Sequence, residues 1–235
     1  MIMKKDELLD KSLGEIVTEN FRTASVFKEA GLDFCCGGSR SLKDACVEKN
    51  IDPELVAEKI LNTAEENDYK SFKYSEWSPV FLSDFIINTH HRYIQKALPD
   101  LLFYTDKIAR VHGTRHKELY QVASLFSELN DDLRQHLKKE EELLFPAIRH
   151  VSEKKSGRDK PLIKSLLKKM ATEHEVAGDT MDRINSLTQG YKVPEDGCNT
   201  YALTMKLLSE FEDDLHVHVH LENNILYPAA RVLAE

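Results

Sequence analysis

The chain has little of what most other protein classes need. Its 235 residues include only 9 glycines, 7 prolines and 1 tryptophan, and no convincing strand alternation of apolar and polar residues occurs, which disfavours a β-rich fold. No apolar run approaches the ~20 residues that a membrane-spanning helix needs. The start, Met-Ile-Met-Lys-Lys-Asp-Glu, lacks the apolar core of a signal peptide. We therefore expect a cytoplasmic, mainly helical protein with no membrane partner.

Basic residues and cysteines are also few. Lys and Arg number 32 against 40 Asp and Glu, a net charge of -8, so the chain has no basic footprint for nucleic acid. Four cysteines, at positions 35, 36, 46 and 198, do not form the even framework of a disulfide-rich secreted domain. We expect them to be thiols unless they serve redox or metal chemistry.

Helical signals divide the chain into three parts. Residues 1–66 form a small helical domain, residues 67–78 are a polar linker without periodicity, and residues 79–235 contain four long periodic segments. The small domain has start signals at Ser12, Ser41 and Asp52-Pro53. The long segments cover about 79–110, 116–151, 159–189 and 198–234. Short connections between them predict an all-α, up-down four-helix bundle, with Pro99 kinking or splitting the first helix.

One motif, H-x3-E-x3-L-[FY]-P, occurs twice, from His136 to Pro146 and from His218 to Pro228. Residues four apart lie on one helix face, so the His and Glu of each copy can reach the same point. An imidazole nitrogen beside a carboxylate oxygen suits iron, manganese or zinc.

The expected apolar stripe of each long segment contains one histidine, and two stripes add a glutamate. The stripes are Ile87, His91, Ile94, Leu98 and Leu101 in the first segment; Phe126, Leu129, Leu133, His136, Glu140, Leu143 and Ala147 in the second; Ile163, Leu167, Met170, His174, Ala177, Met181 and Ile184 in the third; and Phe211, Leu215, His218, Glu222, Ile225 and Ala229 in the fourth. One such histidine alone is more often a satisfied core residue. Six buried ionisable groups together are too costly without an ion, and they predict a metal centre.

The other histidines and the acids beside His174 suit simpler roles. His216 and His220 share a polar stripe with Ser209, Glu212, Asp213 and Asn223, which we expect to face solvent. His90 points about 100° away from His91 around the helix, and is either an outer-shell donor or without a role. His112 and His116 flank Gly113 at a helix junction, and His150 suits a helix C-terminus. Glu173 and Glu175 flank His174; one could orient an imidazole, but surface charge is the favoured interpretation.

The ligand set narrows the choice of metal. Six ligands are too many for one zinc, and the absence of sulfur argues against an iron-sulfur cluster at this site. Two irons bridged by Glu140 and Glu222, with two histidines each, fit and leave room for an oxo bridge and an external ligand such as O2 or NO. Ferritin-like sites use Glu-x-x-His and more carboxylate, so this nitrogen-rich set points to the hemerythrin type.

With these motifs, the chain resembles the RIC (repair of iron centres) family over nearly its full length. The family's D-[FY]-C-C-G-G motif matches residues 33–38, its E-H-x-x-A-G motif matches residues 173–178, and both copies of the His-Glu motif and His91 ahead of Leu98-Pro99 also match. The resemblance implies a hemerythrin-like bundle behind an N-terminal domain, and an oxo- and carboxylate-bridged di-iron centre. It also implies a cytoplasmic homodimer that repairs iron-sulfur proteins damaged by oxidative or nitrosative stress, by donating or handling iron. The bundle has one His ligand fewer than oxygen-carrying hemerythrins, which counts against simple oxygen carriage.

The adjacent thiols of Cys35 and Cys36 cannot form a relaxed disulfide, because neighbouring Cα atoms are too close. They are candidates for redox chemistry or for handling iron or NO, and a helix N-terminus near Ser41 would lower a thiol pKa. The alternative is that they are buried small apolar residues, but the family motif favours a functional role. Cys46 and Cys198 are interpreted as structural.

Three other functions stay open on the residues alone. The di-iron site could reduce NO to N2O, it could sense O2 or NO with the N-terminal domain as output, or the chain could be an inert helical adaptor.

Overall fold

The computed structural model describes residues 5–65, 73–154 and 157–235. Helices dominate this part of the chain, which has no β-strand, only an isolated bridge between Ser12 and Ser41. The expected all-α class is confirmed. Two compact units form, one from Met1–Ser78 with Val219–Ala229, the other from Pro79–His218 with Ala230–Glu235. The second unit begins at Pro79, and residues 67–72 of the expected linker lie outside the described residues.

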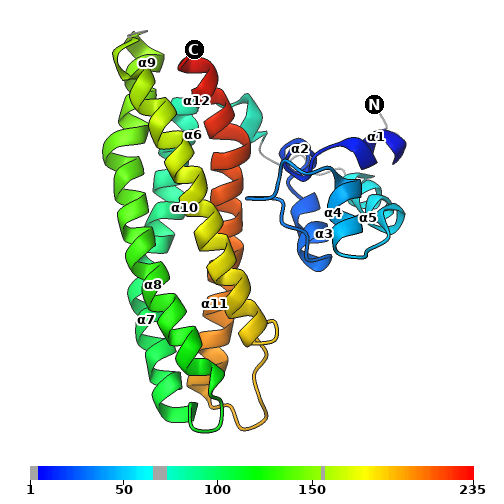
Figure 1. The fold of residues 1–235 in the computed structure, drawn as a ribbon, viewed down its shortest axis with the longest axis vertical. Coiled ribbons are helices and arrows are strands. Elements are labelled where there is room, and N and C mark those ends of the chain that lie inside the picture. The colour runs from blue at the N-terminus through cyan, green and yellow to red at the C-terminus, as the bar shows by residue number, and fades with distance from the viewer. Residues whose placement is uncertain (1–4, 66–72, 155–156) are drawn as a thin grey trace. The chain divides into compact units, whose positions relative to one another are not determined.

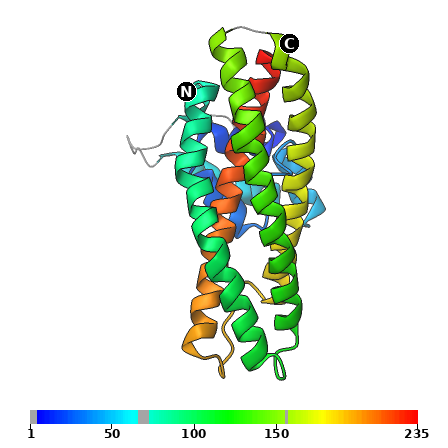
Figure 2. The same ribbon diagram turned by 90° about the vertical axis from the view of Figure 1, so that its left-hand side faces the viewer.

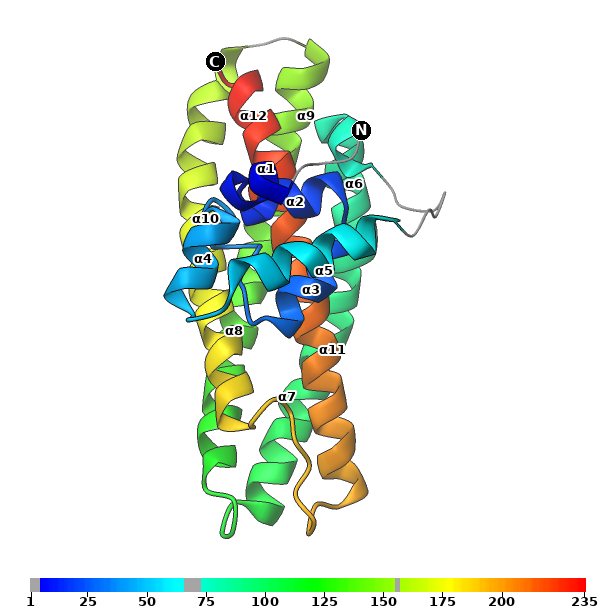
Figure 3. The same ribbon diagram turned by 90° about the vertical axis from the view of Figure 1, so that its right-hand side faces the viewer.

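The described residues of the N-terminal part of the first unit form five short helices (Figure 3). They are α1 (Lys5–Asp10), α2 (Leu13–Glu19), α3 (Thr23–Glu29), α4 (Leu42–Glu48) and α5 (Pro53–Glu65), followed by the 3-10 turn η1 (Tyr74–Glu76). The start signals in the sequence are confirmed at α2, α4 and α5. Ser12 and Glu15 make a full capping box, Ser41 caps α4, and Asp52 Oδ1 accepts from the Glu54 N–H 2.9 Å away.

Four long helical segments make up the bundle (Figures 1 and 2). The first is α6 (Pro79–Ile86), η2 (Ile87–His91) and α7 (Arg92–His112), and the second is α8 (Glu118–Lys139), η3 (Glu140–Leu144) and α9 (Phe145–Lys154). The 3-10 turn η4 (Gly157–Asp159) precedes the third, α10 (Lys160–Leu187), and the fourth is α11 (Asn199–Leu221), η5 (Glu222–Leu226) and α12 (Tyr227–Leu233). α7 runs through Pro99 without interruption, so of the two expectations for this proline the split is wrong, and the kink stays a prediction.

Three of the four segments contain a π-helical turn, and each turn carries a residue of the expected metal site. His91 ends η2, Glu140 begins η3 and Glu222 begins η5. The widened turns are closed by i→i−5 hydrogen bonds, such as the Phe145 N–H to the Glu140 carbonyl and the Tyr227 N–H to the Glu222 carbonyl. Turns of this kind are frequent at functional sites.

The π turns shift the buried stripe by one residue. Leu143 was expected in the core but is 45% exposed, whereas Leu144 is fully buried. In the same way Ile86 is buried in place of Ile87, and Ala230 in place of Ala229. A helix with an extra residue per turn rotates everything that follows, so a strict 3.6-residue period fails there. α10, which is described throughout, has no π turn, and its expected stripe is buried at every position.

Candidate metal centre

The structure brings together all six residues that the sequence marked as metal ligands. Every one of them is at most 3% exposed. They form two overlapping groups, His91, Glu140, His218 and Glu222, and His136, Glu140, His174 and Glu222, in each of which the ligand atoms lie within 4.8 Å of one another. Glu222 follows His218 by one turn of the same continuous helix. Each group therefore pairs two imidazoles with the same two carboxylates.

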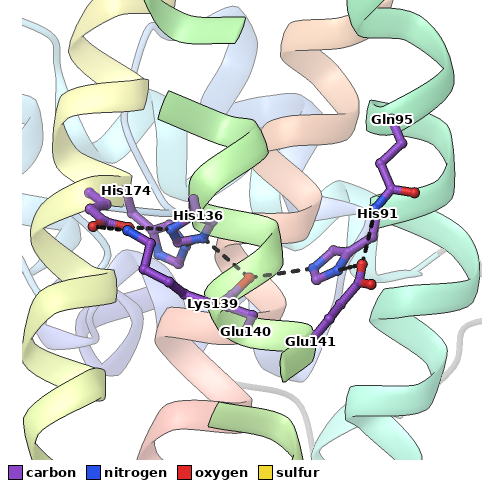
Figure 4. A network of polar contacts seen from close by, with 8 residues as sticks. His91, Gln95, His136, Lys139, Glu140, Glu141 and His174 are labelled. Carbon is purple, nitrogen blue, oxygen red and sulfur yellow. Dashed lines mark hydrogen bonds and ion pairs between the residues drawn. The ribbon is translucent and has the colours of Figure 1, made fainter. Parts of the chain in front are cut away.

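Glu140 lies between histidines of the two groups (Figure 4). Its Oε2 is 3.4 Å from His91 Nε2 and 3.2 Å from His136 Nε2, and His136 Nε2 is 3.0 Å from His174 Nε2. Two ligands at right angles, each about 2.1 Å from a metal, are about 3.0 Å apart. The spacing and the mixed nitrogen and oxygen donors thus fit a bound transition metal.

Two glutamates outside the six hold imidazoles of the site in place. Glu141 Oε1 lies 2.9 Å from His91 Nδ1, and Glu173 Oε2 lies 2.9 Å from His136 Nδ1. A carboxylate at Nδ1 keeps the proton there and leaves Nε2 to face the site. Glu141 also accepts from Gln95, and Glu173 from Lys139 (Figure 4).

The two glutamates stay ionised. The hydrogen bond from His91 lowers the pKa of Glu141, against the effect of partial burial. Burial raises the pKa of Glu173, but the hydrogen bonds from His136 and Lys139 outweigh it and lower the value to about 2. Surface charge was the favoured interpretation of Glu173 and is wrong: this residue orients the imidazole of His136 on α8, not that of its neighbour His174.

His90 lies beside the cluster and is itself buried. Its Nδ1 is 2.9 Å from Asp214 Oδ1, and its ring stacks on that of His218, with 5.9 Å between centroids and 10° between planes. Of the two expectations for His90, the structure favours an outer-shell role.

A cavity of about 230 Å³ reaches the site between α8, α10 and α11. Its lining includes His136, His174 and His218, with the apolar side chains of Leu133 and Ala177 beside them. Asp132, Gln135 and Lys139 also line it. A small ligand or an ion therefore has space next to three of the six clustered residues.

Comparison with known proteins agrees with this geometry. Residues 84–230 match the hemerythrin HHE cation-binding domain, and residues 9–64 match the ScdA_N domain, described as a domain of unknown function (DUF542). The chain is 33% identical over 232 residues to the iron-sulfur cluster repair protein ScdA of Staphylococcus epidermidis, covering 97% of this chain and 98% of that protein. It is also 33% identical over 222 residues to the iron-sulfur cluster repair protein YtfE of Yersinia pestis, covering 94% and 96%.

The chain belongs to the ScdA/YtfE family of iron-sulfur cluster repair proteins. The expected resemblance is thereby confirmed. The hemerythrin match implies iron binding, and the buried His/Glu cluster can hold a metal. Within the described part of this family member, every helix is too short or too polar to cross a membrane.

The vicinal cysteines of the family's N-terminal domain are free thiols with 4.0 Å between their sulfurs. Asp33 organises their loop, because its carboxylate accepts from the N–H groups of Cys35, Cys36 and Gly37. Cys35 is buried, and its pKa is raised well above the usual value by the Cys36 thiol, by burial and by the Asp33 charge. The expectation of a lowered thiol pKa is therefore wrong for Cys35.

The polar stripe expected to face solvent on α11 is partly buried. His220 is fully buried, with Phe34 and Phe21 ring centroids 5.7 and 6.2 Å away, and this burial lowers its pKa to about 4. Asn224, one turn further, binds the carbonyls of Phe34 and Cys35 at 3.2 and 3.3 Å. The periodicity of one helix could not predict these contacts. Their partners are Phe21, just before α3, and Phe34 and Cys35 in the cysteine loop.

Asp33, Cys35 and Cys36 form a further group that could hold a cation, and Asp182, Glu212 and His216 form another. Glu212 is buried, and its carboxylate accepts from the Tyr191 hydroxyl at 2.9 Å and the Asn185 amide at 3.0 Å. These bonds explain its burial without a metal. We therefore interpret Glu212 as the anchor of the loop that ends α10.

Proposed function

We propose that this protein repairs iron-sulfur clusters damaged by oxidative or nitrosative stress, and that it does so by holding two irons and donating iron. The observation that carries the proposal is the pair of buried four-residue groups that share Glu140 and Glu222. Two relatives that match almost the whole chain are iron-sulfur cluster repair proteins, which supports the proposal.

Each residue has a defined role in this proposal. His91 and His218 would hold one iron, His136 and His174 the other, and the two shared glutamates would bridge them, together with an oxo group. Bound there, the irons supply redox chemistry and a store of the metal that a damaged cluster has lost. Glu141 and Glu173 keep the Nδ1 protons of two ligands in place, so both imidazoles stay oriented when the site is empty.

The cavity supports exchange rather than permanent storage. The polar side chains of Asp132 and Gln135 line this cavity together with His136 and His174. A site that donates iron needs such a path, whereas a purely structural metal site is closed. O2 or NO would reach the centre by the same route.

The remaining parts of the proposal concern partners. The clients would be damaged iron-sulfur proteins in the cytoplasm, and the active form would be a homodimer. Cys36 and Cys35 would handle iron or NO during transfer. Because the Cys35 thiol stays protonated at neutral pH, Cys36 is the better candidate for the first contact with a ligand.

The test is reactivation of a purified dehydratase whose cluster has been nitrosylated. Iron-loaded protein carrying an enriched iron isotope should restore activity, and the isotope should appear in the client. The double variant Glu140→Gln/Glu222→Gln should bind less than half the iron and fail. Glu142→Gln, an exposed neighbour, serves as the control and should act like the wild type. Reactivation without isotope transfer would overturn iron donation.

The cavity also favours a second candidate, reduction of NO to N2O. Gas chromatography of N2O, with NO and an electron donor supplied, separates the two activities. Sustained N2O release that is lost in the double variant, without reactivation of the client, would replace repair by NO reduction.

A further inference from the structure

We propose that Cys198 is a reactive thiolate, paired with His112, that forms mixed disulfides with small-molecule disulfides. The pair lies at the other end of the bundle from the metal centre. His91 is the last residue of η2, and His112 is the last residue of α7, which follows η2 directly. The 21 residues of α7 place the two histidines roughly 30 Å apart. The inference does not depend on the proposed repair function.

The geometry is that of a nucleophile with its partner. His112 Nε2 lies 3.2 Å from Cys198 Sγ, within the reach of a hydrogen bond to sulfur. His112 is buried, with its ring edge on Tyr201 at 5.4 Å between centroids. Cys198 is the exposed member of the four cysteines. The imidazole is thus fixed inside the bundle while the sulfur faces solvent.

Burial decides where the proton of His112 sits. Its Nδ1 atom is buried and has no hydrogen-bond partner among the described residues. A proton on Nδ1 would be a buried donor without an acceptor, which is unfavourable. The geometry therefore favours a proton on Nε2, where it is donated toward Cys198 Sγ. A donor at this position stabilises the thiolate over the thiol.

The start of α11 acts in the same direction. Cys198 directly precedes this helix of 23 residues, and its carbonyl accepts the N–H of Ala202 at 3.0 Å, as in a helix cap. The His112 hydrogen bond, and with it the backbone N–H groups of Tyr201 and Thr200, lowers the pKa of Cys198 to about 7. A thiol at a helix N-terminus is favoured as the anion.

Charged groups near the Cys198–His112 pair form ion pairs with one another. Asp196 pairs with Arg115 at 3.1 Å and with His116 at 2.9 Å. His116 Nδ1 is also 3.4 Å from Glu118. Asp196 and Glu118 thus each face a basic group, and the third acid at this end of the bundle, Glu195, is exposed to solvent.

The reaction needs no further reagent than the disulfide itself. The Cys198 thiolate attacks one sulfur of R–S–S–R, the S–S bond breaks, and a Cys198–S–S–R bond forms. The other half leaves as RS⁻ and takes a proton from water, so one disulfide is exchanged for another without net oxidation. The thiol of Cys46 cannot compete, because it is fully buried and burial raises its pKa.

The experiment uses the full chain, with oxidised glutathione and iodoacetamide as separate probes and peptide mass spectrometry as the readout. Cys198 should be the fastest site for both, with an alkylation midpoint near pH 7 in place of the ordinary value of about 8.5. His112→Leu should raise that midpoint and slow alkylation at pH 7 several-fold. His116→Leu is the matched control, because His116 contacts Asp196 and not the sulfur, and it should leave the rate unchanged.

Two results would overturn the inference. One is a wild-type midpoint at Cys198 near pH 8.5, which decides the matter even if His112→Leu fails to fold. The other is an equal effect of His112→Leu and His116→Leu, which would assign the reactivity to general exposure of this end of the bundle.

Discussion

At the scale of single residues, the carboxylates behind the histidines decide how firmly the cluster is arranged. Glu173 reaches from α10 to His136 on α8 and also pairs with Lys139. Its neighbour on the other side of His174, Glu175, is exposed. The two therefore offer a matched pair of substitutions on one helical turn.

We expect Glu173→Gln to weaken iron binding about 10–100-fold, because a neutral amide replaces the charged carboxylate that fixes the proton of His136 on Nδ1. Glu175→Gln should bind iron like the wild type. Competitive titration against a chelator of known affinity measures both. Equal affinities for the two variants would show that Glu173 is only a surface charge.

The sequence could predict the six clustered residues, because His136/Glu140 and His218/Glu222 repeat at helical spacing and His91 and His174 fall on apolar stripes. Spacing along one helix cannot show which residue of another helix lies opposite. The partner of His91 depends on how η2 lies against η3, and that of His136 on how α8 lies against α10. Glu141 was therefore not singled out, and Glu173 was misinterpreted. His112 and Cys198, 86 residues apart, are a contact of the same kind.

At the scale of elements, the π turns explain why some buried positions differ by one residue from those that a regular helical period predicts. Pro146 and Pro228 follow η3 and η5, and a proline ring collides with the carbonyl four residues earlier in a regular helix. Widening the turn before each proline relieves this conflict. No proline closely follows η2, so the local sequence gives no comparable signal for this π turn.

The register shift in the second segment can be tested with adjacent leucines. We expect Leu144→Ala to lower the free energy of unfolding by about 2–5 kcal/mol, because it opens a cavity in the core. Leu143→Ala should change it by less than about 0.5 kcal/mol, since Leu143 lies at the surface. Denaturant unfolding of the metal-free protein gives both values. A larger loss for Leu143→Ala would mean that the helix keeps its regular period through residues 140–144.

At the scale of the whole molecule, the bundle gathers six ionisable side chains into one buried cluster. Such a cluster is held together best when a metal compensates the desolvated imidazoles and carboxylates. Binding to the folded state alone stabilises it by about 2.7 kcal/mol when free metal exceeds Kd 100-fold. For a chain of this size that corresponds to a rise in Tm of roughly 5–10 °C.

We therefore expect ferrous iron to raise the Tm of the wild type and of Glu142→Gln by this amount, and to raise that of Glu140→Gln/Glu222→Gln far less. Differential scanning calorimetry under anaerobic conditions, with and without metal, measures the shift within each protein. Comparing each protein with its own metal-free form removes any effect of the substitutions on the fold itself. An equal rise in the double variant would place the stabilising metal elsewhere, and the shared glutamates would then have no part in binding it.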